Sequence, residues 1–89
     1  MKVQFTTRAR QDLRDIGDYI AADNPFRARS FVVELRDASL SLGERPLRFP
    51  QLEGFVRQGY RRRVHGNYLI IYRIIRVVSS SVDLSGLGL

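Results

Sequence analysis

The sequence predicts an α+β fold in which a helical hairpin covers a mainly antiparallel sheet. Three observations lead to this prediction. The chain opens with a short alternation of apolar and polar residues, continues with two stretches of helical periodicity, and then returns to alternation. Helices that cover one face of a sheet are a layer arrangement suited to this order. We expect a single domain over residues 1–89, because no internal repeat or long linker divides the chain.

The first two elements are a strand and a helix. Val3 and Phe5 alternate with polar neighbours in MKVQFT, which is typical of a half-buried strand. Between Thr7 and Asp23, apolar residues recur at helical spacing and opposite charges stand four residues apart. The apolar positions are Ala9, Leu13, Ile16 and Ile20, and the charged pairs are Arg8 with Asp12 and Arg14 with Asp18. This pattern predicts an amphipathic helix.

A second helix follows at once. Asn24 is a favourable N-cap, and Pro25 occupies the first helical position, where its missing N–H is not needed. The apolar periodicity continues to Leu42, and we expect Gly43 to end the helix in a left-handed conformation. So short a break between two helices predicts a helical hairpin.

Two strands are expected after an irregular connection. ERPLRFPQLEG, residues 44–54, contains two prolines and a glycine and predicts no regular element. Residues 56–64 alternate with a period of two, HGN at 65–67 suits a turn, and residues 67–75 form a further strand. That last strand is apolar on both faces, which predicts a central position in the sheet.

Residues 77–89 form an atypical tail. Val82 and Leu84 alternate with Ser81 and Asp83, which indicates a final strand and makes the last part of the sheet three-stranded. The turn before it falls either within IIRVV or at SSS, and the sequence leaves both positions open.

The composition restricts the function classes. Fourteen arginines and one lysine against nine acids give a net charge of +6, which favours acidic partners. The absence of cysteine and the single histidine exclude thiolate and all-histidine metal sites, and we expect no cofactor. We see no signal peptide and no apolar stretch that could span a membrane, and we expect a cytoplasmic protein.

One motif in GYRRRVHGNYLIIYR resembles a known group of proteins. The motif consists of Gly59, an arginine two residues on (Arg61), a hairpin glycine (Gly66), a tyrosine (Tyr68) and the Tyr-Arg pair Tyr72-Arg73. With ARQDLRDIGDYIA, NPFRARSFV and LGERPLRFP, they resemble the RelE/ParE superfamily of type II toxin-antitoxin toxins, and its ParE branch most closely, over residues 1–76.

This resemblance implies a function in binding. ParE-like toxins poison DNA gyrase and are neutralised by a ParD-like antitoxin, so we expect both partners here, and operator DNA only through the antitoxin complex. RelE-like relatives cleave messenger RNA on the ribosome, which is the alternative. The tail lacks the family's histidine- and arginine-containing end, so an inactive variant with a replaced C-terminus that still binds antitoxin is a third hypothesis.

Candidate residues for partner binding lie in the same region. They are Arg57, Arg61, Arg62, Arg63, Tyr68, Tyr72 and Arg73. We expect the arginines to face a protein partner, because carboxylates pair well with guanidinium groups. We assign no catalytic residue and interpret His65 as an exposed turn residue rather than a general base.

Overall fold

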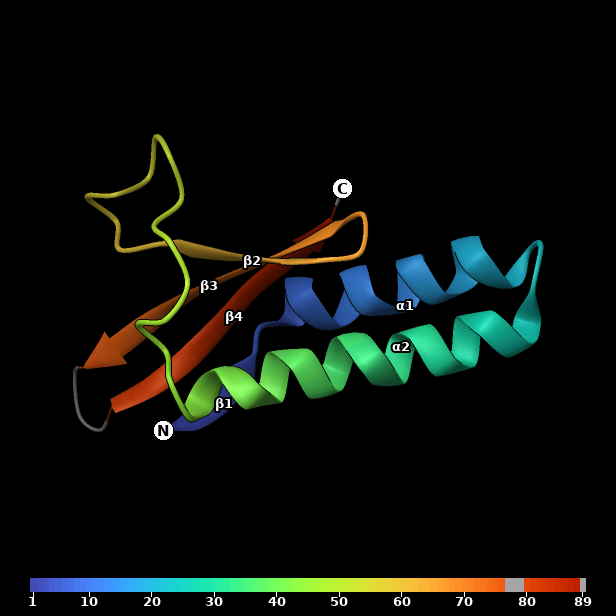
Figure 1. The fold of residues 1–89 in the computed structure, drawn as a ribbon, viewed down its shortest axis with the longest axis horizontal. Coiled ribbons are helices and arrows are strands. Elements are labelled where there is room, and N and C mark those ends of the chain that lie inside the picture. The colour runs from blue at the N-terminus through green and yellow to red at the C-terminus, as the bar shows by residue number, and fades with distance from the viewer. Residues whose placement is uncertain (77–79, 89) are drawn as a thin grey trace.

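The computed structural model describes residues 1–76 and 80–88. A strand is followed by two long helices, a single 3₁₀ turn, a long loop and three further strands (Figure 1). These elements are β1 (Lys2–Phe5), α1 (Thr7–Ala21), α2 (Pro25–Leu40), η1 (Ser41–Gly43), β2 (Arg61–His65), β3 (Tyr68–Arg76) and β4 (Ser80–Gly88).

The four strands form one mixed sheet in the order β1-β4-β3-β2. β1 pairs with β4 in parallel, whereas β4 with β3 and β3 with β2 are antiparallel. The predicted α+β class is therefore confirmed. The predicted central position of residues 67–75 is confirmed by β3, which has a neighbour on each side.

The helical hairpin forms as the capping signals predict. The Asn24 side chain accepts a hydrogen bond from the Arg27 N–H at 3.0 Å, and Pro25 begins α2. Thr6 caps α1 in the same way, through Ala9 N–H at 3.0 Å. The connection between the helices extends beyond the sheet (Figure 1).

The predicted role of Gly43 is wrong. α2 ends at Leu40 and tightens into η1, and Gly43 does not adopt a positive φ. Its carbonyl instead accepts a hydrogen bond from the Met1 amino group at 2.7 Å, and a Cβ at this position would collide with the Met1 carbonyl oxygen. Glycine is needed here for close backbone approach rather than for a left-handed cap.

The strand predicted at residues 56–64 begins later, at Arg61. Gly54 and Gly59 take φ values of 84° and 80°, which only glycine adopts easily. Hydrogen bonds between residues close in sequence, such as the one from Gly59 N–H to the Val56 carbonyl at 3.0 Å, fold residues 52–60 into turns. The alternating pattern in this stretch was therefore misleading.

The tail supplies an interior strand of the sheet. β4 lies between β1 and β3, and Val82, Leu84 and Leu87 are buried. Ser85 has no partner on β3, because Ile71 pairs with Gly86 and Tyr72 with Leu84. This β-bulge shifts the alternation by one residue, so that Leu84 and Leu87 both point into the core. The two alternative turn positions depend on residues 77–79, which lie outside the described residues.

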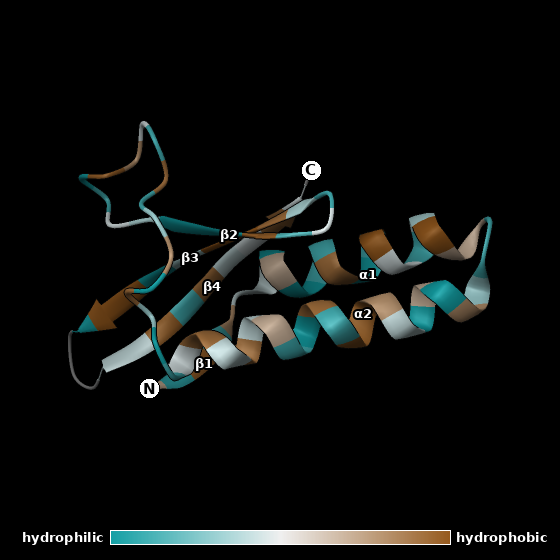
Figure 2. Cartoon of the chain, in the orientation of Figure 1, coloured by the Kyte–Doolittle hydropathy of each residue, from teal (hydrophilic) through white to brown (hydrophobic). Residues whose placement is uncertain are grey.

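The core lies between the hairpin and one face of the sheet. It joins α1, α2 and η1 to β3 and β4 through Ala9, Ile16, Phe31, Leu35, Ala38, Leu42, Ile70, Tyr72, Val82, Leu84 and Leu87. β2 is hydrophilic and β3 largely hydrophobic (Figure 2). None of the helices in the described part of the chain is long and apolar enough to cross a membrane.

Candidate partner-binding surfaces

The seven candidate residues lie in or beside the β2-β3 hairpin, but the pleat sends them to different faces. Paired residues on neighbouring strands share a face. Arg61 and Arg63 pair with Tyr72 and Ile70 and so share the face covered by the helices. Arg62 pairs with Ile71 and lies on the opposite face, which we call the open face.

Arg61 and Arg63 bind groups of their own chain. Arg61 Nη1 donates to the Phe49 carbonyl at 2.7 Å. Arg63 Nη1 donates to the Ala38 carbonyl and to Ser41 Oγ, both at 2.7 Å, and its guanidinium lies 4.8 Å from the Phe49 ring centre. A cation at the last turn of α2 hydrogen-bonds carbonyl groups that have no partner within the helix, and it interacts favourably with the negative end of the helix dipole. These two arginines thus hold the loop and α2 against the sheet.

Tyr72 and Tyr68 also face inward. Tyr72 is fully buried, and its hydroxyl donates to the Pro46 carbonyl at 2.7 Å. Burial raises the pKa of the Tyr72 phenol above its ordinary value, and the positive charge of Arg61 partly opposes this shift. Tyr68 is half-buried and packs against Phe31, with ring centres 5.4 Å apart.

Arg57, Arg62 and Arg73 remain available to a partner. Arg57 is exposed in the loop, whereas Arg62 and Arg73 are half-buried on the open face. The Arg73 guanidinium lies 5.1 Å from the Tyr60 ring centre. Its Nε is buried and has no hydrogen-bond partner among the residues that the structure describes.

The interpretation of His65 as an exposed turn residue is wrong. It is the last residue of β2, and the turn consists of Gly66 and Asn67. Its ring lies 5.7 Å from the Phe31 ring centre, and its Nε2 lies 3.8 Å from Glu34 Oε1. His65 therefore joins the sheet to α2 and takes part in packing.

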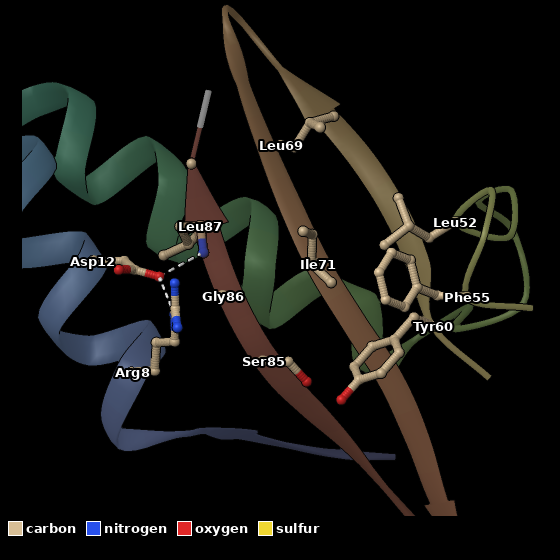
Figure 3. Close-up of a pocket in the computed structure, with 11 residues that line it drawn as sticks. Arg8, Asp12, Leu52, Phe55, Tyr60, Leu69, Ile71, Ser85, Gly86 and Leu87 are labelled. Atoms are coloured by element: carbon tan, nitrogen blue, oxygen red, sulfur yellow. Dashed lines mark hydrogen bonds and ion pairs between the residues drawn. The ribbon is translucent and has the colours of Figure 1, made fainter. Parts of the chain in front are cut away.

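A groove crosses the open face between the start of α1 and the loop (Figure 3). We call it the open-face groove; its volume is about 510 Å³. Its floor is Leu69, Ile71, Gly86 and Gly88, one wall is Arg8 and Asp12, and the other is Leu52, Phe55 and Tyr60. Sequence reasoning missed this groove, although the second apolar face of β3 and the Gly-X-Gly spacing in β4 were signals for it.

The net charge is divided sharply between the two layers. Residues 7–40, which form the helical hairpin, contain six arginines and six acids. The remainder contains one lysine and eight arginines against three acids, and so carries the whole net charge of +6. The sheet and the loop are therefore the part of the molecule that attracts acidic partners.

The arrangement of these residues suits binding. Among the candidate residues, Arg61 and Arg63 are held by carbonyl oxygens, the Arg73 guanidinium lies over the Tyr60 ring, and Arg57 faces solvent. These arginines offer charge and directed N–H groups. Among residues 1–76 and 80–88, no group of three or more His, Cys, Asp or Glu side chains could hold a metal ion.

Comparisons with known proteins agree with this fold. A family model described as "ParE toxin of type II toxin-antitoxin system, parDE" matches residues 3–83. No curated protein matches the chain. A solved structure described as "Chromosomal ParDE TA system from P. aeruginosa" superimposes with a TM-score of 0.80 at 18% identity, covering 99% of this chain and 94% of that one. At this identity the superposition supports the fold, and the family match over 3–83 shows that the chain belongs to the ParE toxin family.

Proposed function

We propose that this type II toxin acts by binding and poisoning DNA gyrase, and that a ParD-like antitoxin neutralises it. The family match to ParE toxins of parDE systems supports the proposal. In this proposal the toxin works in the cytoplasm, as its cysteine-free composition suggests. It contacts operator DNA only within the antitoxin complex.

The observation that carries a binding function is the division of charge. The neutral helical hairpin and the strongly basic sheet and loop give the chain one surface suited to acidic protein segments. A binding mechanism also fits the placement of the inward arginines and of His65, whose contacts are with their own chain. We therefore propose that toxicity requires no catalysis by this chain.

The proposal is tested by gyrase supercoiling of relaxed plasmid with increasing amounts of the chain. We expect inhibition that the protein encoded by the adjacent gene relieves when it is added in equimolar amount. A parallel assay with programmed ribosomes tests for cleavage of messenger RNA. Cleavage without gyrase inhibition would replace the proposed mechanism with the ribonuclease mechanism.

A third outcome concerns the atypical tail. A folded chain that binds the antitoxin but neither inhibits gyrase nor cleaves RNA would identify an inactive variant. Binding to the antitoxin alone is measured by thermal unfolding, because a ligand that binds only the folded state raises its apparent stability.

A further inference from the structure

The end of the sheet farthest from the β2-β3 turn brings together segments that are distant in the sequence (Figure 1). β1 begins there, β3 ends there and β4 begins there, because Lys2 pairs with Ser81 and Arg76 pairs with Ser80. The loop that follows η1 lies beside the same end, next to the N-terminus, whose amino group is bonded to the Gly43 carbonyl. Side chains from the loop, β3 and the N-terminus therefore meet at one place.

Two hollows open between these segments. The larger has a volume of about 560 Å³ and is lined by Met1, Arg45, Pro46, Leu47, Arg48 and Arg76. The smaller has a volume of about 350 Å³ and is lined by Ser41, Glu44, Arg45, Arg48, Phe49 and Arg63. Because both contain Arg45 and Arg48, they adjoin along the loop, and we call them together the loop cleft. Four arginines and a single acid, Glu44, line it.

Three of these arginines are available to a ligand. Arg45, Arg48 and Arg76 are exposed, and none of them takes part in an ion pair among residues 1–76 and 80–88. The Arg48 guanidinium lies 5.5 Å from the Phe49 ring centre, and that of Arg63 lies 4.8 Å from the same ring. Contact with a ring occupies the face of a guanidinium group and leaves the N–H donors at its edge for an anion.

The loop that carries two of these arginines is held in place by the sheet. The Pro46 carbonyl accepts a hydrogen bond from the hydroxyl of the buried Tyr72 at 2.7 Å. The Phe49 carbonyl accepts one from Arg61 Nη1, also at 2.7 Å. A loop that is already ordered loses less conformational entropy when a ligand binds. The loop cleft is therefore preorganised.

The shape and charge of the loop cleft favour a polyanion that lies on the surface. Leu47 and Met1 are 60% and 49% exposed, so the larger hollow is shallow and does not enclose a small molecule. Duplex DNA carries one charge about every 1.7 Å along its axis. An acidic peptide carries at most one charge about every 3.3 Å, and so matches clustered cations less well. The open face differs, because Asp12 and Asp83 lie among its arginines.

We propose that the loop cleft binds the phosphodiester backbone of a nucleic acid, with Arg45, Arg48 and Arg76 as the residues that contact phosphate. Such contacts carry no sequence information, so recognition of the operator still depends on the antitoxin, and the toxin adds phosphate contacts of its own. The inference goes beyond the proposed function and does not require it, because the cleft belongs to this chain alone.

The test measures how the chain alone binds a short fluorescent DNA duplex of arbitrary sequence at increasing salt. Arg45→Gln combined with Arg48→Gln should weaken binding at least about ten-fold at low salt and reduce the slope of log affinity against log salt by about 1.8. The control, Arg29→Gln with Arg36→Gln, removes the same charge from exposed positions of α2 and should leave the slope nearly unchanged. Equal effects of the two pairs would reveal diffuse attraction by net charge and overturn the proposal.

A second variant guards against a change in loop conformation. Arg76→Gln lies at the end of β3, outside the loop, and should reduce the slope by about 0.9 without changing thermal stability. Wild-type slopes in both folded variants would overturn the assignment of the cleft.

Two further titrations identify the source of the charge that the cleft binds. Weaker binding of both DNA and RNA by the Arg45/Arg48 variant would support a site for any phosphodiester backbone, and a loss for one of them would identify that nucleic acid as the ligand. Polyglutamate that displaces DNA at equal charge concentration would assign the cleft to acidic proteins and overturn the proposal. Since neither gyrase nor antitoxin is present in these assays, such a failure leaves the proposed function standing.

Discussion

Consecutive arginines on β2 have different roles because the pleat alternates their direction. Arg61 and Arg63 reach carbonyls of the loop and of α2, whereas Arg62 lies on the open face beside Ile71. The sequence predicts the alternation of these three residues correctly. It does not reveal that two of them bind their own chain, because the carbonyl acceptors are 12 and 25 residues distant.

The first residue-scale prediction compares the effects on stability of substitutions at Arg63 and at its neighbour Arg62. Arg63→Ala should lower the free energy of unfolding by roughly 1–2 kcal/mol, because two hydrogen bonds to a charged donor and a ring contact are lost. Arg62→Ala is the matched control and should change stability by less than about 0.5 kcal/mol. Urea unfolding of both variants provides the measurement, and equal losses would contradict the different roles assigned here.

Tyr72 gives a prediction about pH. Because burial raises its pKa in the folded state, the unfolded chain ionises first, and the stabilisation by the neutral phenol disappears as the pH rises past the folded pKa. Tyr72→Phe should cost about 1 kcal/mol near neutrality through loss of the bond to Pro46. The stability difference between wild type and variant should stay constant below about pH 10, the ordinary pKa of the unfolded phenol, and should shrink over the range above it. A difference that stays constant over this range would show that Tyr72 does not titrate as stated.

At the scale of elements, the capped helices and the irregular connection at residues 44–54 were predictable, whereas the extension of this loop to residue 60 was not. Asn24, Pro25 and the apolar spacing of α1 and α2 act within a few residues, so their effect can be read locally. The start of β2 depends on the positive φ of Gly59, and the bulge at Ser85 depends on pairing with β3. Both require contacts or conformations that alternation alone does not encode. The open-face groove has the same origin, since its walls come from α1 and the loop.

The tail provides the prediction at this scale. Leu84 is fully buried in an interior strand, so Leu84→Ala should cost about 2–4 kcal/mol and unfold a substantial fraction of so small a domain. Ser80→Ala, on the same strand but exposed, is the control and should leave stability within about 0.5 kcal/mol. Circular dichroism during thermal unfolding measures both. A stable Leu84→Ala variant would show that β4 is dispensable to the fold.

For the whole molecule, the division of charge sets how a partner approaches. Steering by the basic sheet and loop should make association with the antitoxin faster at low salt. We expect the association rate constant to fall at least several-fold between about 0.05 M and about 0.5 M salt, as the Debye length shortens, with a smaller change in the dissociation rate constant. Stopped-flow mixing measures both rates, and an association rate independent of salt would refute steering.

The most direct test of the central claim, that acidic partners bind the sheet rather than the helices, is a matched pair of charge reversals. Arg62→Glu reverses one charge on the open face, and Arg36→Glu reverses one charge at an exposed position of α2. Titration calorimetry with the antitoxin should show at least about ten-fold weaker binding for Arg62→Glu and nearly wild-type binding for Arg36→Glu. Equal losses in the two variants, or a greater loss for Arg36→Glu, would contradict the account.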